Sequence, residues 1–239
     1  MRKDKVMPEG KWEFDAEVAE SFEDMLIRSI PQYDVMRDTV FNLVKYFIGD
    51  EFKIKFPTIM DIGSSRGDAI APLIDEFGAK CNYVLAEISD PMLQQLHKRF
   101  DTHIHSNKIK ILKCDLRNDF PSYKADLTLS ILTLMFVPIE CRQLLIKRIY
   151  NGLSEEGVFI CVEKHLTSSY ETDVVFTKLY YDKKKNSGYT EDAIERKRLS
   201  LQGVLVPITS TWMQDMLSDF KTVECFWRWM NFTGWIAIK

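Results

Sequence analysis

Acidic residues and glycines stand in a regular order in the first half of the chain, each after a short apolar run. Asp61 precedes Gly63 and Gly67, which bracket a Gly-Ser-Ser-Arg-Gly turn, and Glu87 and Asp115 follow the next two apolar runs. Glycines let a turn approach a ligand closely, and the helix that follows offers unpaired N–H groups. A carboxylate at the end of the second strand suits the two hydroxyls of a ribose. The set therefore predicts a nucleoside pocket.

Two other readings of these residues bear on that prediction. The turn lacks the middle glycine of the Gly-x-Gly-x-x-Gly pattern, which argues against a pyrophosphate on this loop. The acids have the alternative role of capping the helices that follow, as Asp and Ser commonly do. Capping is a fair role for Asp90, but we do not expect it to account for all three strand-end acids.

The elements that must position these residues follow from the hydrophobic pattern. Strand-like apolar runs occupy 58–62, 82–87, 109–112, 127–131 and 158–162. Helix-like segments occupy 15–30, 33–48, 69–76, 91–100 and 139–150. Alternating strands and helices predict a parallel sheet with helices on both faces. The pattern then becomes helical to about residue 201, and strand-like runs at 222–228 and 232–238 predict an antiparallel hairpin at the sheet edge.

The boundaries of the chain's regions follow from these changes in pattern. We expect a single domain over 1–239, with an N-terminal helical segment at 1–50 and a cofactor-binding core at 55–165. A helical insertion or lid at 166–210 and the C-terminal hairpin at 211–239 complete it.

Composition limits the classes of protein that fit. Hydrophobic residues make up 46% of the 239 residues and charged residues 28%, as in ordinary globular proteins. The net charge of −3 excludes a global positive field that would gather nucleic acid. No apolar run reaches a membrane span, the start is charged, and the five cysteines are widely spaced, so we expect a cytoplasmic protein with reduced thiols. The pair His103 and His105 lacks companion ligands, so no metal site is expected.

Residues 55–165 resemble the class I S-adenosylmethionine-dependent methyltransferases, in which a glycine turn, a ribose acid and an adenine-side acid stand in this order. The resemblance implies an α/β, Rossmann-like fold with a mostly parallel seven-stranded sheet. It implies that Gly63 and Gly67 border the methionine part of the cofactor, that Glu87 holds the ribose hydroxyls and that Asp115 meets the adenine amino group.

A narrower resemblance spans almost the whole chain. The segment Trp12-Glu13-Phe14-Asp15, the segment Arg28-Ser29-Ile30-Pro31 with Tyr33, and the segment Asn186-Ser187-Gly188-Tyr189 with Lys197-Arg198 are similar to the carboxy-S-adenosylmethionine synthases. Enzymes of that family carboxylate the methyl carbon of S-adenosylmethionine with prephenate as donor. Their product serves to modify wobble uridine in transfer RNA. The resemblance implies an enzyme that forms a homodimer, acts on a small molecule and meets transfer RNA only indirectly.

The second resemblance also implies the site residues. Arg198 matches the family's carboxylate-holding arginine, and a guanidinium suits that task because it binds a carboxylate bidentately. Residues implied to bind S-adenosylmethionine, its carboxylated form or S-adenosylhomocysteine are Tyr33, Asp61, Gly63, Ser64, Ser65, Gly67, Glu87, Ile88, Asp115, Leu116, Ser130, Ile131 and Arg198. Ile131 stands where the synthases carry asparagine, so one polar contact is missing or has moved to Ser130. Without the resemblance, Arg198 reads as a solvated cation on a helix face of mixed charge.

Two alternative functions stay open at this point. An ordinary methyltransferase acting on a small acceptor would use the same pocket, with the insertion as a substrate lid. A cofactor-binding or RNA-binding scaffold without turnover would use a basic face formed by 183–185 with Arg196, Lys197 and Arg198. A lysine triplet is more often the solvated end of a helix.

Overall fold

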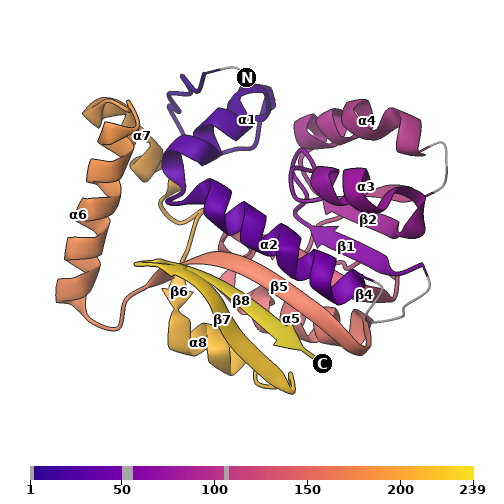
Figure 1. Cartoon of the computed structure of the whole chain (residues 1–239). Helices are drawn as coiled ribbons and strands as arrows, with labels where there is room; N and C mark the ends of the chain where they lie inside the picture. The colour runs from indigo at the N-terminus through magenta and orange to yellow at the C-terminus, as the bar shows by residue number, and fades with distance from the viewer. Residues whose placement is uncertain (1–2, 50–55, 105–107) are drawn as a thin grey trace.

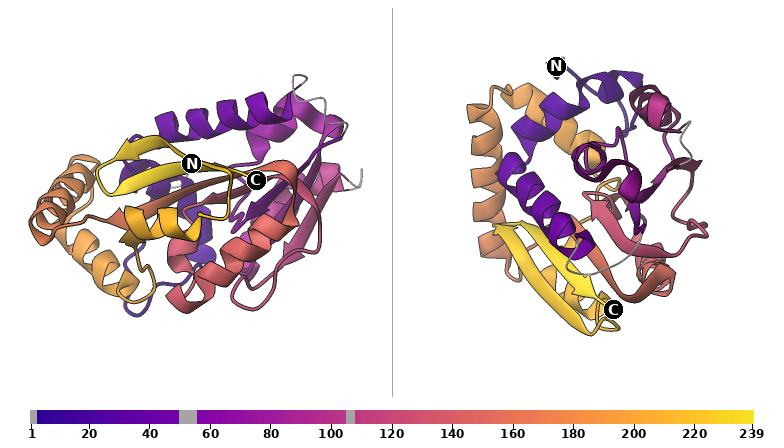
Figure 2. Two further views of the ribbon diagram at one scale, coloured as in Figure 1. Left: turned by 90° about the horizontal axis from the view of Figure 1, so that it is seen from below. Right: turned by 45° about the vertical axis from the view of Figure 1, so that its right-hand side comes forward.

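The computed structural model of the chain describes residues 3–49, 56–104 and 108–239. His105 and parts of the predicted regions 1–50 and 55–165 therefore lie outside the described residues. Helices cover both faces of one central sheet, and the hairpin of α6 (Tyr170–Asn186) and α7 (Glu191–Leu201) projects at one end of the molecule (Figures 1 and 2).

The sheet runs in the order β3-β2-β1-β4-β5-β8-β7. Its strands are β1 (Thr58–Ile62), β2 (Asn82–Glu87), β3 (Ile109–Lys113), β4 (Ala125–Ile131), β5 (Leu153–Leu166), β7 (Thr222–Trp229) and β8 (Phe232–Ile238). The neighbouring strands from β3 through β2, β1 and β4 to β5 pair in parallel. Strand β8 pairs antiparallel with β5 and with β7. The predicted seven-stranded α/β fold with its C-terminal hairpin is confirmed.

Each face of the sheet carries its own helices. The helices are α1 (Ala16–Ser29), α2 (Tyr33–Ile48), α3 (Ala71–Phe77), α4 (Asp90–Ile104), α5 (Ile139–Gly152), α6 (Tyr170–Asn186), α7 (Glu191–Leu201) and α8 (Ser210–Met216). Apolar residues of α2, α3 and α4 pack with Leu127 and Leu129 on one face. Those of α5 and α8 pack with Met60 and Phe159 on the other. Alternation along each strand sends successive side chains to opposite cores.

Local signals in the sequence set the helix ends. The side chain of Asp15 accepts a hydrogen bond from the backbone N–H of Val18 at 2.9 Å and so caps α1. Ser169 and Thr190 cap α6 and α7 in the same way. Helix α2 begins after Gln32, whose left-handed φ of 49° turns the chain between α1 and α2.

Some elements differ from the prediction. Strand β5 begins at Leu153 rather than at 158: Leu153 pairs with Ala125 of β4, and the register then shifts before Val158, so the strand crosses polar residues that give no apolar run. Helix α8 was not predicted, since seven residues with two buried methionines show too little periodicity. The two-residue strand β6 (Ile208–Thr209), which pairs with β5, was also missed. The cysteines are free thiols: Cys81, Cys114 and Cys161 are buried as expected, whereas Cys141 is half-buried and Cys225 is exposed.

Candidate active site at the carboxyl ends of the strands

The carboxyl ends of four neighbouring strands meet at one edge of the sheet. The pairing of Ile62 with Ala86 and of Glu87 with Lys113 sets the ends of β1, β2 and β3 side by side. Strand β4 flanks β1 on the other side, with Leu129 opposite Asp61. The structure thus brings the turn and the acids that follow β1, β2 and β3 to one edge. We call Asp61, residues 63–67, Glu87 and Asp115 the strand-end site.

The carboxylate of Glu87 connects the glycine turn to the backbone that follows β2. Its Oε2 accepts a hydrogen bond from the backbone N–H of Ser65 at 2.7 Å, and its Oε1 accepts from the N–H groups of Ile88 and Ser89 at 2.8 Å each. The side chain is buried. A carboxylate has about four lone-pair sites, so these three bonds fix its orientation and leave acceptor capacity for a ligand hydroxyl. Capping of α4 falls to Ser89, whose hydroxyl accepts from the N–H of Met92 at 3.3 Å, while Asp90 pairs with Lys113.

The two glycines of the turn are needed for packing inside the protein. Gly63 has a φ of 70°, and a Cβ there would lie 2.3 Å from the side chain of Thr133. Gly67 has a φ of 76°, and a Cβ there would lie 2.4 Å from the ring of Phe100. The turn is further closed by a bond from the N–H of Gly67 to the carbonyl oxygen of Ser64 at 2.7 Å. The close approach that the structure shows at these glycines is to protein side chains.

Asp61 is a buried acid without a full set of partners. Its side chain is 2% exposed, and Oδ2 has no hydrogen-bond partner in the structure. Burial raises the pKa of Asp61 to about 7, against the opposing charge of Arg37. Ser130 is also fully buried and its hydroxyl has no partner. Buried polar groups are normally hydrogen-bonded, so these orphaned atoms fit a site that a polar ligand completes.

The side chain of Asp115 is held by a neighbouring arginine. Both oxygens of Asp115 accept hydrogen bonds from the guanidinium of Arg117, at 2.7 to 3.0 Å, and this pairing lowers the pKa of Asp115. The pair is exposed, where such pairs contribute little to stability and exchange readily. Of the other predicted contacts, Leu116 is buried, Ile131 is half-buried and Ile88 is 46% exposed.

Helix α2 carries Tyr33 and Arg37 one turn apart, with the guanidinium carbon of Arg37 5.9 Å from the ring centroid of Tyr33. Tyr33 is half-buried at the start of α2, burial raises its pKa, and the charges of Arg37, Asp68 and Glu23 act on it. Tyr33 was among the predicted cofactor contacts, and Arg37 was not. The available signal was spacing, because residues four apart on a helix share a face.

Arg198 lies elsewhere in this chain. It is exposed on α7, and its Nε and Nη2 donate to the carboxylate of Glu195 at 2.7 Å each. In the part of the chain that the structure describes, its recorded partners are Glu195 and the nearby Tyr181, and none is a strand-end residue. The predicted carboxylate-holding arginine is thus not assembled with Glu87 and Asp61 within one chain.

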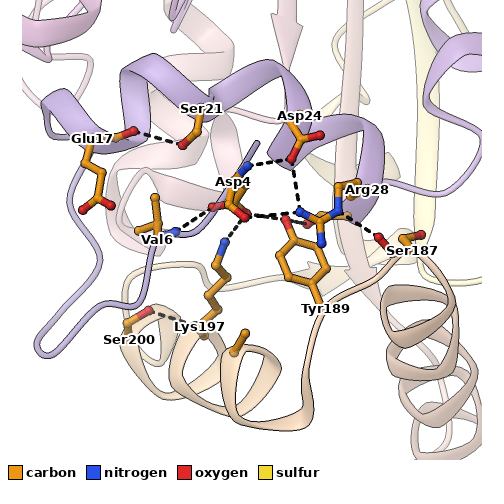
Figure 3. Close-up of polar contacts among 12 residues, drawn as sticks. Asp4, Val6, Glu17, Ser21, Asp24, Arg28, Ser187, Tyr189, Lys197 and Ser200 are labelled. Carbon is orange, nitrogen blue, oxygen red and sulfur yellow. Dashed lines mark hydrogen bonds and ion pairs between the residues drawn. The ribbon is translucent and has the colours of Figure 1, made fainter. Parts of the chain in front are cut away.

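A buried polar cluster, formed by Asp4, Asp24, Arg28, Tyr189 and Lys197, joins the start of the chain to α1 and α7 (Figure 3). The hydroxyl of Tyr189 and the ammonium of Lys197 both donate to Oδ2 of Asp4. Arg28 donates to Asp24 at 3.1 Å, and its guanidinium lies 4.0 Å from the ring centroid of Tyr189. We call this group the N-terminal polar cluster. It fixes α7, and with it the backbone that carries Arg198, against α1.

The N-terminal polar cluster also corrects one hypothesis from the sequence. Lys197 is 3% exposed, and Lys184 is buried beside the rings of Tyr180 and Tyr189. Lys185 pairs with Glu191, at 2.6 Å. The basic face considered for RNA is therefore not formed, because two of its lysines point into the protein and its arginines are paired with acids of α7.

Two further findings concern what the described residues do not contain. No group of three or more His, Cys, Asp or Glu among them is arranged to hold a metal ion. None of the helices in the described ranges is long and apolar enough to cross a membrane.

Fold and site define a class of protein. Residues 59–157 match the family described as Methyltransferase domain. An O-methyltransferase family protein from Burkholderia thailandensis superposes with a TM-score of 0.64 at 14% identity, over 94% of this chain and 60% of that one. Human N-acetylserotonin methyltransferase superposes with a TM-score of 0.59 at 15% identity, over 94% and 55%. At such identities the likeness shows the fold, which is that of the class I S-adenosylmethionine-dependent methyltransferases.

Full-length relatives narrow the class. A carboxy-S-adenosyl-L-methionine synthase of Methylococcus capsulatus is 34% identical over 95% of this chain and 93% of its own length. The synthase of Staphylococcus epidermidis is 33% identical over 96% of this chain and 97% of its own length. The chain belongs to the carboxy-S-adenosyl-L-methionine synthase family and is a transferase of that type.

Proposed function

We propose that this protein carboxylates the methyl group of S-adenosylmethionine, with an acid such as prephenate as the carboxyl donor. The observation that carries the proposal is the juxtaposition of Glu87 with the turn at 63–67 and the unpartnered Asp61. This set supports binding of a nucleoside that bears an amino acid. The near full-length similarity to carboxy-S-adenosylmethionine synthases supports the type of transfer.

Each residue of the strand-end site binds a different part of S-adenosylmethionine. Glu87 accepts the ribose hydroxyls, since it is prepositioned by three backbone N–H groups. Asp115 accepts from the adenine amino group when Arg117 moves aside, and Leu116 and Ile88 offer apolar contact to the base. Asp61 accepts from the ammonium of the methionine part, which would return its pKa toward the ordinary range by supplying an opposite charge.

The reaction needs an acidic methyl group. In S-adenosylmethionine the adjacent positively charged sulfur makes the methyl group acidic. In prephenate the bond between the ring and its carboxyl group breaks and releases carbon dioxide, and the electron pair of that bond makes the ring aromatic by expelling the ring hydroxyl as hydroxide. The hydroxide takes a proton from the methyl carbon to give water, and the methyl carbanion forms a bond to the carbon of carbon dioxide. For its part, the protein must align the two substrates and stabilise the new carboxylate, a role suited to the guanidinium of Arg198. Because Arg198 is exposed on α7, this role requires α7 to move or a second chain to supply the arginine.

The direct test is incubation of the purified protein with S-adenosylmethionine and prephenate labelled with ¹³C in the ring carboxyl group. Mass spectrometry is expected to show labelled carboxy-S-adenosylmethionine. The matched control is Glu87→Gln, which removes the charge that receives the ribose. Absence of product from a wild-type protein that binds S-adenosylmethionine would overturn the proposal.

A second candidate is an ordinary methyltransferase. The position of Arg198 favours it, because the arginine that would read a carboxylated methyl group is paired with Glu195 and away from the strand-end site. Under this function the same incubation yields S-adenosylhomocysteine once an acceptor is supplied, and no carboxylated product.

The setting of the reaction is also part of the proposal. We place the enzyme in the cytoplasm as a homodimer that acts on small molecules and reaches transfer RNA only through its product. Support for the indirect role comes from the burial of Lys184 and Lys197, which removes two of the six residues of the basic face considered for RNA.

A further inference from the structure

The Trp-Glu-Phe-Asp motif at 12–15 has no role in the function proposed above. It ends a segment that is described from residue 3 and forms neither helix nor strand before α1 begins at Ala16. Within this motif Trp12 is buried and Phe14 is half-buried. A segment without regular structure keeps its place through individual contacts, so the partners of Trp12 and Phe14 show which parts of the protein it joins.

Phe14 contacts two loops that border the strand-end site. Its carbonyl oxygen accepts a hydrogen bond from the hydroxyl of Ser89 at 2.6 Å. Its ring meets the ring of Phe136 edge to face, with 5.0 Å between the centroids. Ser89 follows β2 and Phe136 follows β4, and β1 lies between these strands in the sheet. Phe14 therefore spans the loops on both sides of the turn at 63–67.

The loop after β2 is the one that orients Glu87. The backbone N–H of Ser89 donates to Oε1 of Glu87 at 2.8 Å. Ser89 thus bonds to Phe14 through its hydroxyl and to the proposed ribose acid through its N–H. A displacement of Ser89 would turn the carboxylate of Glu87, because three N–H groups set the orientation of that carboxylate.

The loop after β4 reaches the glycine turn from the other side. The N–H of Phe136 donates to the carbonyl oxygen of Thr133 at 3.0 Å. The side chain of Thr133 lies against Gly63, where an added Cβ would come within 2.3 Å of it. The packing of Phe14 on Phe136 therefore acts on the glycine turn through one intervening residue.

A small core separate from the two cores of the sheet supports these contacts. Phe14 and Phe136 pack against it, as do Leu201 at the end of α7 and Val204. We call this group the N-terminal core, and its buried members are Val6, Trp12, Val18, Ala19, Phe22, Met25 and Met92. In Figure 1 the segment before α1 and α1 itself lie between α7 and α4. The N-terminal core therefore joins the border of the strand-end site to the end of α7.

Trp12 fixes the other side of the motif to α7. Its backbone N–H donates to the carbonyl oxygen of Ser200 at 3.0 Å, and Ser200 comes two residues after Arg198. Trp12 and Phe14 are two residues apart, and an extended chain spans at most about 7 Å over two residues. The end of α7 is thereby held close to the loops of the strand-end site.

An element that binds both loops and the end of α7 holds the parts that the reaction must align. We infer that Phe14 is a positioning residue: it holds the loop of Glu87 against the loop after β4, at a fixed place relative to α7. It acts through Ser89 and Phe136, not on the reacting atoms. The inference rests on the proposed function in taking Glu87 as the group that binds the ribose.

The size of the effect follows from the contacts. Without Phe14 in place, a smaller fraction of the molecules has Glu87 oriented for the ribose, and the affinity for the nucleoside falls by the same factor. A role confined to packing in the N-terminal core would instead lower the free energy of unfolding and leave the affinity of the folded protein unchanged. Affinity therefore distinguishes the two roles.

The test is calorimetric titration of S-adenosylhomocysteine and of 5′-methylthioadenosine, at a temperature where every variant is folded by circular dichroism. Phe14→Leu removes the ring contact with Phe136, and Ser89→Ala removes the bond to the carbonyl oxygen of Phe14. The control for the first is Phe226→Leu, which removes a half-buried ring that packs on Gly234 in the outer pair of strands.

The second variant has its own control because Ser89 also caps α4. Ser169→Ala removes a hydroxyl that accepts from the N–H of Thr172 at 3.2 Å and caps α6, much as Ser89 accepts from the N–H of Met92 at 3.3 Å. Ser89→Thr keeps the hydroxyl and tests for recovery. Phe14→Leu leaves the cap of α4 in place, so the loss of affinity must appear in both variants.

We expect Phe14→Leu and Ser89→Ala each to bind S-adenosylhomocysteine about 3- to 10-fold more weakly than wild type, the worth of one aromatic pair or one hydrogen bond. The loss should be the same for 5′-methylthioadenosine, which has the ribose and lacks the amino acid. Ser89→Thr should bind as wild type does. The two controls should stay within about twofold of wild type, although their melting temperatures fall.

Three outcomes would overturn the role of Phe14. One is unchanged affinity in Phe14→Leu, and another is an equal loss in Phe226→Leu, since both leave Phe14 with a packing role only. The third is a loss for S-adenosylhomocysteine that 5′-methylthioadenosine does not share, because the effect would then bypass the ribose and Glu87.

Failure of the proposed function gives a different result. A wild-type protein that binds S-adenosylhomocysteine but makes no carboxylated product overturns the function and leaves the role of Phe14 standing. A wild-type protein that does not bind S-adenosylhomocysteine overturns both.

Discussion

Two buried aspartates, in two polar regions of the chain, differ in their hydrogen bonds and in the direction of their pKa shifts. Asp4 in the N-terminal polar cluster and Asp61 in the strand-end site are 4% and 2% exposed. Burial alone would raise the pKa of Asp4, but bonds from Lys197 and Tyr189 outweigh it and the pKa is lowered. Burial raises the pKa of Asp61 to about 7, since no such bonds offset it among the described residues.

The difference separates a structural cluster from the proposed binding site. A charge that the protein has fully paired stabilises the fold, whereas a buried charge left incomplete costs stability until a ligand completes it. The N-terminal polar cluster therefore holds α7 in place, and the strand-end site is ready for a cation. Perturbed acids in a site of this kind are a physical marker of function.

The largest effect is expected where the paired charge is broken. Lys197→Met leaves Asp4 buried without its cation, so the free energy of unfolding should fall by about 3–5 kcal/mol. Urea denaturation measures this. The matched control is Arg196→Met one residue away, which removes an exposed pair with Asp192 and should cost under about 1 kcal/mol. Equal losses for the two variants would remove the distinction between the cluster and an ordinary surface.

Asp61→Asn should act in the opposite direction. The folded pKa of Asp61 lies above its unfolded value of 3.8, so the ionised group lowers stability increasingly as pH rises from about 4 to about 7. The variant should be about 2–4 kcal/mol more stable than wild type at pH 8 and close to it at pH 4. Thermal unfolding at both values measures this.

The same variant should lose ligand affinity. With the carboxylate gone, S-adenosylhomocysteine should bind more weakly, and the proton that wild type releases on binding near pH 7 should disappear. Titration in two buffers of different ionisation enthalpy counts that proton. A variant that is destabilised at pH 8, or that keeps full affinity, contradicts the account of Asp61.

Glu87→Gln is expected to weaken the binding free energy of S-adenosylhomocysteine by about 1–3 kcal/mol, because the variant loses the charge that accepts hydrogen bonds from the ribose hydroxyls. Glutamine keeps one acceptor oxygen, for the N–H of Ser65, but its NH2 group then faces the N–H groups of Ile88 and Ser89, so the melting temperature should also fall. Adenine alone, which has no ribose, should bind as it does to wild type. Full affinity for the nucleoside would refute the ribose assignment.

The smallest effect on stability is expected at Arg198. The side chain is exposed and its pair with Glu195 is of the kind worth under about 1 kcal/mol, so Arg198→Ala should unfold almost as wild type does. Its preference for carboxy-S-adenosylmethionine over S-adenosylmethionine should nevertheless be lost. Competition binding with the two nucleosides checks this, and an unchanged preference would remove the residue from the site.

Much of this was predictable from the chain, for identifiable reasons. The strand-end acids could be placed because parallel strands bring their carboxyl ends to one edge. Asp4 could not be found, since its partners Tyr189 and Lys197 lie more than 180 residues away and no local pattern links them. Helix α8 was hidden in a segment too short to show a period.

The central claim is that the strand-end site holds S-adenosylmethionine for carboxylation. It is tested most directly by mass spectrometry of the small molecule released when freshly purified protein is denatured. The account predicts carboxy-S-adenosylmethionine from wild type and its absence from Glu87→Gln. S-adenosylmethionine or S-adenosylhomocysteine alone would contradict the carboxylating function, and the absence of any nucleoside would contradict the site itself.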